Sequence, residues 1–122
     1  MILVDTSVWV GHLRRMDRGL ANLLDEGRIL SHPFVVGELA LGNLRPRDRV
    51  LSALQRLPQA TFATNSEVLE FVERHHLYGI GIGYIDAHLL ASVQLRSGAA
   101  LWTRDKSLQA AAEKLGLAWS AR

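Results

Sequence analysis

The sequence predicts an α/β fold in which helices cover both faces of a parallel sheet. Short apolar runs alternate with longer amphipathic segments along the 122 residues. The chain has no cysteine and is 48% hydrophobic, so packing without disulfides must stabilise it. We therefore expect a single domain over residues 1–122, without a linker or an internal repeat.

Short apolar runs at five places are predicted to form the strands. The first, Ile2 to Val4, is aliphatic at every position, which is typical of a central parallel strand buried on both faces. The polar sequence Asp-Thr-Ser follows it directly. The five predicted strands are residues 2–4, 28–31, 60–63, 99–102 and 117–119.

Helices are predicted between the strands from the 3.6-residue spacing of apolar side chains and from capping residues. The predicted ranges are residues 8–15, 19–26, 34–41, 47–57, 67–77, 85–97 and 107–115. Thr6 or Ser7 is expected to cap the first helix, and Thr64, Asn65 or Ser66 the fifth. YGIGIGY, at residues 78–84, lacks the third glycine of a dinucleotide fingerprint, so we interpret it as a tight turn.

Four acidic residues are the candidates for chemistry. Asp5 and Asp105 follow predicted strands, whose carboxyl ends form the sheet edge where ligands bind in α/β folds. Glu38 and Asp86 are the lone acids of two helices so apolar that we expect them to be buried, where an ionised carboxylate is costly unless paired. The plainer alternatives are helix capping by Asp5, a salt bridge from Glu38 to an arginine, and a dipole interaction for Asp86.

Convergence of these four acids would predict a metal site. Carboxylates that meet repel one another unless a hard divalent cation lies between them, and oxygen ligands without cysteine favour Mg²⁺ or Mn²⁺ over zinc. Such an ion retains waters, one of which it can activate against a phosphodiester. Twelve of the 14 basic residues are arginines, gathered around residues 14–18 and 45–49, and their planar groups suit phosphate. The pattern predicts a metal-dependent nuclease.

The histidines are predicted to lie at the surface or to cap loops rather than to bind metal. Adjacent helical positions such as 75 and 76 point about 100° apart and do not easily share an ion. This prediction covers His12, His32, His75, His76 and His88. No apolar run approaches the ~20 residues of a membrane span, and the chain does not begin with a signal-peptide pattern, so we expect a soluble, cytoplasmic protein.

Four segments together resemble the PIN-domain ribonucleases, and among them the VapC-type toxins of bacterial toxin–antitoxin pairs. They are ILVDTSVW, VVGELALG, GIGIGYIDAHLLAS and LWTRDKSL, and the resemblance extends over essentially the whole chain. It implies a three-layer α/β/α fold with a central parallel sheet of about five strands. It also implies that Asp5, Glu38, Asp86 and Asp105 are the acidic residues of a Mg²⁺ or Mn²⁺ site.

The resemblance further implies partners and supporting residues. Thr6 and Thr103 match positions that hold or orient the pocket by hydrogen bonds. The implied protein is an endonuclease acting on RNA, a homodimer, and the target of a cognate antitoxin whose C-terminal segment lies in the active groove. Many relatives carry another acid or histidine two residues after the aspartate equivalent to Asp105, followed by phenylalanine. Ser107 and Leu108 stand there instead, so we expect one tightly held ion, with a second recruited only by substrate phosphate.

In the expected mechanism, Asp5, Asp86 and Asp105 hold the ion, and Glu38 binds it through water or accepts a proton from the attacking water. Two other classes remain open. A haloacid-dehalogenase-type phosphotransferase also has an aspartate after its first strand, but it needs a second one where this chain has Ser7. A domain that only binds RNA or a partner would have structural acids and no affinity for metal.

Overall fold

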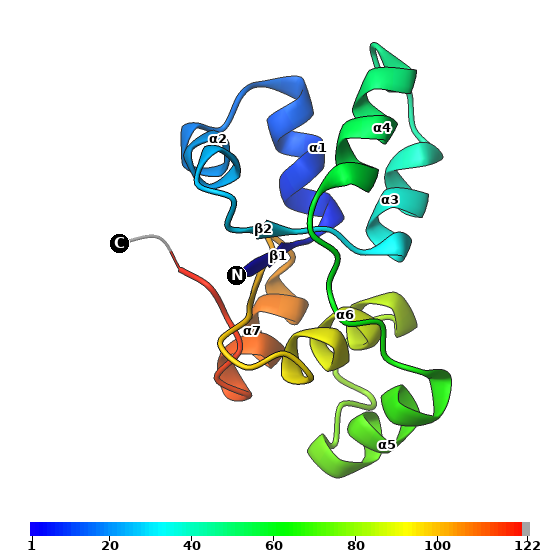
Figure 1. Cartoon of the computed structure of the whole chain (residues 1–122). Helices are drawn as coiled ribbons and strands as arrows, with labels where there is room; N and C mark the ends of the chain where they lie inside the picture. Colours follow the sequence, from blue (N-terminus) through cyan, green and yellow to red (C-terminus); the bar gives the residue numbers. More distant parts are fainter. Residues whose placement is uncertain (121–122) are drawn as a thin grey trace.

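The computed structural model describes residues 1–120, which form an α/β fold around a small parallel sheet (Figure 1). In that sheet β1 (Ile2–Val4) lies between β2 (Ile29–Leu30) and β3 (Ala100–Trp102), and both neighbours run parallel to it. The predicted α/β class is confirmed. Residues 121–122 of the predicted domain lie outside the described part of the chain.

The predicted count of about five strands is too high for residues 1–120. Residues 60–63 form no strand, and the residue before them, Gln59, makes only an isolated bridge to Ser31 at one edge of the sheet. Within 117–119, Ala118 makes only an isolated bridge to Leu101 at the other edge. Strand β2 is only two residues long, so the edge chain beside it has little backbone with which to pair before it turns away. Five segments therefore line up, but three of them are strands.

Seven helices within residues 1–120 surround the sheet, and each begins within two residues of its predicted start. None of them is long and apolar enough to cross a bilayer. The helices are α1 (Thr6–Arg14), α2 (Arg18–Asp25), α3 (Pro33–Ala40), α4 (Arg47–Arg56), α5 (Asn65–His75), α6 (Tyr84–Gln94) and α7 (Lys106–Lys114).

The start of α1 differs from the prediction in a way that matters for the site. Asp5 occupies the N-cap position with an extended backbone, but its side chain makes no capping hydrogen bond. Thr6 and Ser7 lie inside the helix, so neither is its cap. In α5, by contrast, Thr64 caps as predicted: its hydroxyl accepts from the amide of Glu67, whose carboxylate accepts from the amide of Thr64.

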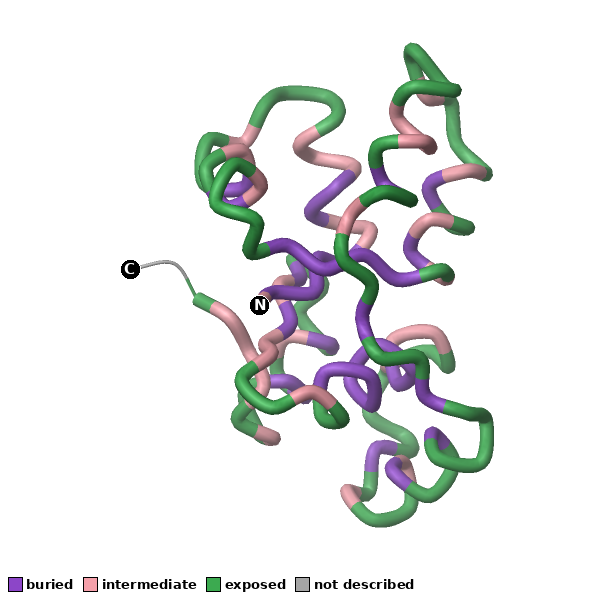
Figure 2. The backbone as a smooth tube through the Cα atoms, viewed as in Figure 1, coloured by how far each residue is buried: buried purple, intermediate pink, exposed green. Residues whose placement is uncertain are grey.

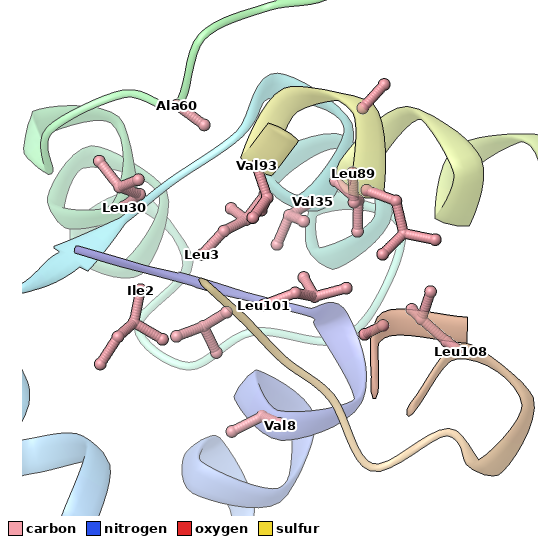
Figure 3. Packing of buried hydrophobic residues seen from close by; sticks show 14 of the residues in the cluster. Ile2, Leu3, Val8, Leu30, Val35, Ala60, Leu89, Val93, Leu101 and Leu108 are labelled. Atoms are coloured by element: carbon pink, nitrogen blue, oxygen red, sulfur yellow. The ribbon is translucent and has the colours of Figure 1, made fainter. Parts of the chain in front are cut away.

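The core covers both faces of β1. Figure 3 shows Leu3 beside Val35 of α3 and Val93 of α6, with Ile2 on the opposite side of the strand. The tube in Figure 2 is buried through β1 and β2, at the middle of β3 and along much of α6. Because both faces of β1 are covered, side chains from this strand can reach a ligand only at its end, where Asp5 stands.

Two of the histidines are fully buried. His32 caps α3, as the loop-capping prediction allows: its Nδ1 accepts from the amide of Phe34 at 3.0 Å, so the proton lies on Nε2, 3.2 Å from the hydroxyl of Ser92. The surface prediction for His88 is wrong, because it lies on the buried side of α6. Its ring centroid is 4.6 Å from that of Phe34 and 4.9 Å from that of Phe62.

Candidate active site

The four predicted acids lie on one side of the molecule, near the ends of β1 and β3. Asp5 follows β1, Asp105 precedes α7, and Glu38 and Asp86 stand on α3 and α6. The carboxylates of the other three all act on Asp86, and each raises its pKa. Glu38 and Asp86 therefore do not point to opposite sides of the protein.

Asp5 is held by hydroxyl groups from two distant parts of the chain. Ser7 Oγ and Thr103 Oγ1 each donate to Asp5 Oδ2 at 2.8 Å. The same hydroxyls accept from the backbone, Ser7 from the amide of Arg104 and Thr103 from the amide of Asp105, both at 3.0 Å. These bonds tie the end of β1 to the end of β3 and fix the carboxylate, which is 7% exposed.

Glu38 is oriented by Thr6, as expected for that threonine. Thr6 Oγ1 donates to Glu38 Oε1 at 2.6 Å and so joins α1 to α3. The expected burial of Glu38 is wrong, because the face of α3 that carries Gly37 and Glu38 is exposed. No ion pair involves Glu38 within residues 1–120, so its partner is a hydroxyl and not an arginine.

Asp86 and Asp105 each stand at the start of a helix. Asp86 Oδ2 accepts from the amide of Gly83 at 3.1 Å in the first turn of α6, and Asp105 Oδ1 accepts from the amide of Leu108 at 2.8 Å as the cap of α7. These bonds to the first turns of the helices thus occupy one oxygen of each group. The positive ends of both helices also favour negative charge here.

The pKa of Asp86 is raised above its ordinary value. Partial burial is the largest cause, and the charges of Asp5, Asp105 and Glu38 act in the same direction, against the hydrogen bond from Gly83. Repulsion from the other three carboxylates thus adds to the effect of burial. A divalent cation among them would relieve the repulsion.

Each of the four carboxylates has one oxygen engaged and one left over. Within residues 1–120 no hydrogen bond reaches the second oxygens, which are Asp5 Oδ1, Glu38 Oε2, Asp86 Oδ1 and Asp105 Oδ2. Four hard oxygen donors fit Mg²⁺ or Mn²⁺. In the same range, no three histidine or acidic side chains are grouped closely enough to hold one metal ion. The four acids therefore lie on the same side of the molecule but do not form a closed cluster.

Ser7 contacts Asp5 but was not predicted as a site residue, since it was considered as a helix cap and as evidence against a phosphotransferase. The available signal was a hydroxyl two positions after a carboxylate at the end of a buried strand. The neighbouring Arg104 has a structural role. Its guanidinium forms an ion pair with Asp17 at 2.9 Å and lies against Gly11, where a Cβ on residue 11 would collide with the guanidinium. That contact fixes the loop between β3 and α7 on α1.

A groove of about 400 Å³ opens beside Glu38, between α1 and the end of α3. Arg14 lines it and so carries a cation toward the acids. Arg47 has a different role, because its guanidinium donates to the carbonyls of Ala40 at 2.7 Å and Gly42 at 3.2 Å, at the end of α3. The apolar residues of the groove are Val10, Leu13, Leu39 and Leu44.

Known proteins are similar to this chain in sequence and in fold. Residues 2–114 match the family model described as PIN domain. The chain is 52% identical over 118 residues to Ribonuclease VapC32 of Mycobacterium tuberculosis, in strains CDC 1551 / Oshkosh and ATCC 25618 / H37Rv, which covers 97% of this chain and 95% of each relative. The solved structure titled "Crystal Structure of FitAcB from Neisseria gonorrhoeae" aligns with a TM-score of 0.63 at 22% identity, over 93% of this chain and 94% of that chain. At that identity the likeness shows a common fold.

Proposed function

Because the chain belongs to the PIN domain family, we propose that it is a VapC-type endoribonuclease, the toxin of a toxin–antitoxin pair, that works with Mg²⁺ or Mn²⁺. The family resemblance predicted from the sequence is confirmed by the family match and by 52% identity over most of the chain. One observation supports the metal site: four carboxylates lie on one side of the molecule, and each has an oxygen that accepts no hydrogen bond. Family membership gives no support to the phosphotransferase alternative.

In this proposal Asp5, Asp86 and Asp105 would hold the cation. When bound, the ion supplies positive charge that stabilises the charge developing on the phosphodiester and makes water more acidic. Ser7 and Thr103 keep the Asp5 carboxylate in one orientation. No acid or imidazole follows Asp105 at the next two positions of α7, which supports one tightly held ion.

Glu38 accepts the proton of the attacking water. Thr6 occupies Oε1 and leaves Oε2 available, and the exposure of Glu38 gives water direct access. The water oxygen bonds to phosphorus while the bond from phosphorus to one sugar oxygen breaks, and that oxygen takes a proton from solvent. Arg14, in the adjoining groove, attracts the RNA backbone, so the affinity for RNA falls as salt is raised.

Calorimetric titration with Mn²⁺ tests the metal site. We expect the wild type to bind Mn²⁺ and the Asp86→Asn variant to lose more than about tenfold in affinity. Loss of a residue that only hydrogen-bonds to a metal ligand already lowers metal affinity by about that factor. The matched control is Asp25→Asn, which neutralises an exposed aspartate at the end of α2 and should bind like the wild type. Equal affinities in the wild type and Asp86→Asn would favour a domain that only binds RNA or protein.

The groove beside Glu38 is proposed as the docking site of the cognate antitoxin. Its apolar lining suits apolar side chains of the antitoxin, and Glu38, one of the four candidate acids, lies in it. We expect Leu13→Asp, which buries a charge in the complex, to weaken antitoxin binding at least roughly tenfold. Unchanged affinity for the antitoxin in calorimetry would place its docking site elsewhere.

We also propose that the toxin is a cytoplasmic homodimer. Several large apolar side chains are exposed and would be covered by a second copy, among them Leu41, Phe62 and Leu69. Sedimentation equilibrium decides this point, because a monomer mass at every concentration would contradict it.

A further inference from the structure

A second cavity, of about 370 Å³, lies between the glycine-rich turn before α6 and helix α7. We call it the turn–α7 cavity. It lies outside the acidic site, and none of the four carboxylates lines it. Its apolar lining consists of Leu77, Ile80, Ala110 and Ala111.

The rim of the turn–α7 cavity is cationic. The two lysines of the chain, Lys106 and Lys114, stand at opposite ends of α7 and both line it. Within residues 1–120 neither lysine forms an ion pair, and no acid lines the cavity. An apolar pocket with a few convergent charges suits a ligand that combines a flat apolar part with an anion.

Both walls of the cavity lead directly to the candidate active site. Lys106 follows Asp105, and the turn on the other side ends at Gly83, whose amide donates to Asp86. Gly81 has φ +86°, and a Cβ there would lie 3.3 Å from the hydroxyl of Ser107, so the turn packs closely on the first turn of α7. A chain bound at the acids thus has a short path into the cavity.

One aromatic ring borders the same cavity, and a second lies next to that ring. His76 lines it from the left-handed C-cap of α5, with φ +53°. Its ring centroid lies 5.9 Å from that of Tyr78, which is 58% exposed. Aromatic rings that border an apolar pocket are the usual platform for an unpaired base.

We propose that the turn–α7 cavity binds a nucleotide that flanks the scissile phosphate in single-stranded RNA. The base lies on the apolar lining beside His76, and successive backbone phosphates lie against Lys106 and Lys114, which bind phosphate as point charges. This assignment rests on the proposed ribonuclease function and adds a substrate-binding subsite to it. Binding of an unpaired nucleotide would account for three features of the cavity together: its apolar lining, its two cations and its proximity to Asp105.

Binding of a fluorescein-labelled ten-nucleotide single-stranded RNA, in EDTA to prevent metal-dependent cleavage, tests the charge of the subsite. We expect Lys114→Ala to raise the Kd about tenfold and to make the salt dependence shallower by about 0.7, the value for one phosphate contact on a single strand. Lys114 lies two helical turns from Asp105, so kcat should stay within twofold while KM rises. The matched control is Arg74→Ala, which removes one exposed cation from α5.

Oligonucleotides with a single abasic position, moved along the strand, test the site for the base. One position should weaken wild-type binding about tenfold, and the Ile80→Ala variant should lose that penalty because the base no longer has its apolar support. The assignment is wrong if Lys114→Ala behaves like Arg74→Ala, or if Ile80→Ala shows the same abasic penalties as the wild type.

The same measurements separate this assignment from the proposed function. If the wild type cleaves RNA and both cavity variants bind it normally, only the cavity assignment fails. If the wild type neither binds nor cleaves RNA, the ribonuclease function and the subsite fail together. A change in the sedimentation mass of the variants without a change in RNA affinity would assign the cavity to a protein interface and overturn the proposal.

Discussion

Asp5→Asn is expected to reduce metal-dependent RNA cleavage by about 10³-fold or more. A bound cation lowers the activation free energy by several kcal/mol, and its binding depends on the negative charge of its ligands. The amide has no negative charge. Its oxygen can still accept from Ser7 and Thr103, as Asp5 Oδ2 does in the wild type. Its NH₂ group then takes the place of the free oxygen and points a donor at the cation site.

Preservation of the fold is what makes this variant informative. Since both hydroxyl bonds to residue 5 are retained, we expect the melting temperature to stay close to that of the wild type. Cleavage of a labelled RNA with Mg²⁺ or Mn²⁺, together with thermal unfolding, measures the two effects separately. Asp25→Asn again controls for the loss of one acidic charge, and full activity in Asp5→Asn would overturn the assigned site.

Acidification is expected to destabilise the protein through His32. Burial and, secondarily, the charge of His88 lower the pKa of His32 from 6.5 to about 4. Above pH 6.5 the imidazole is neutral in both the folded and the unfolded chain. Between pH 6.5 and 4 the unfolded chain binds the proton and the folded chain does not. The free energy of unfolding therefore decreases as the pH is lowered through this range, by about 3 kcal/mol in all.

Urea unfolding at several pH values from 7 to 4 measures this contribution. His32→Asn should be less stable at pH 7, because a buried ring is lost, but its stability should depend less on pH. Asparagine can still cap α3, so the helix start is kept. His75→Asn is the control and should retain the wild-type slope. An identical pH dependence in the wild type and His32→Asn would mean that His32 is not the group responsible.

The four candidate acids come to lie on one side of the molecule for different reasons. Asp5 and Asp105 follow strands that run parallel and side by side, so the chain order alone places them at one edge. Glu38 was singled out because it was expected to be buried, and that premise is wrong. It lies near the other acids because α3 packs on α1, where Thr6 reaches it.

Local patterns in the sequence were sufficient to predict the α/β class, the start of each helix to within two residues, and the acids that follow β1 and β3. Helix caps, apolar spacing and polar residues at strand ends each involve only a few neighbouring positions. Three features required the folded chain: the hydroxyls that hold Asp5, the single bridges that replace two strands, and the burial of His88. The bond from Thr103 to Asp5 joins residues 98 positions apart. Contacts of that kind depend on how the elements pack against one another, and no short stretch of sequence contains that information.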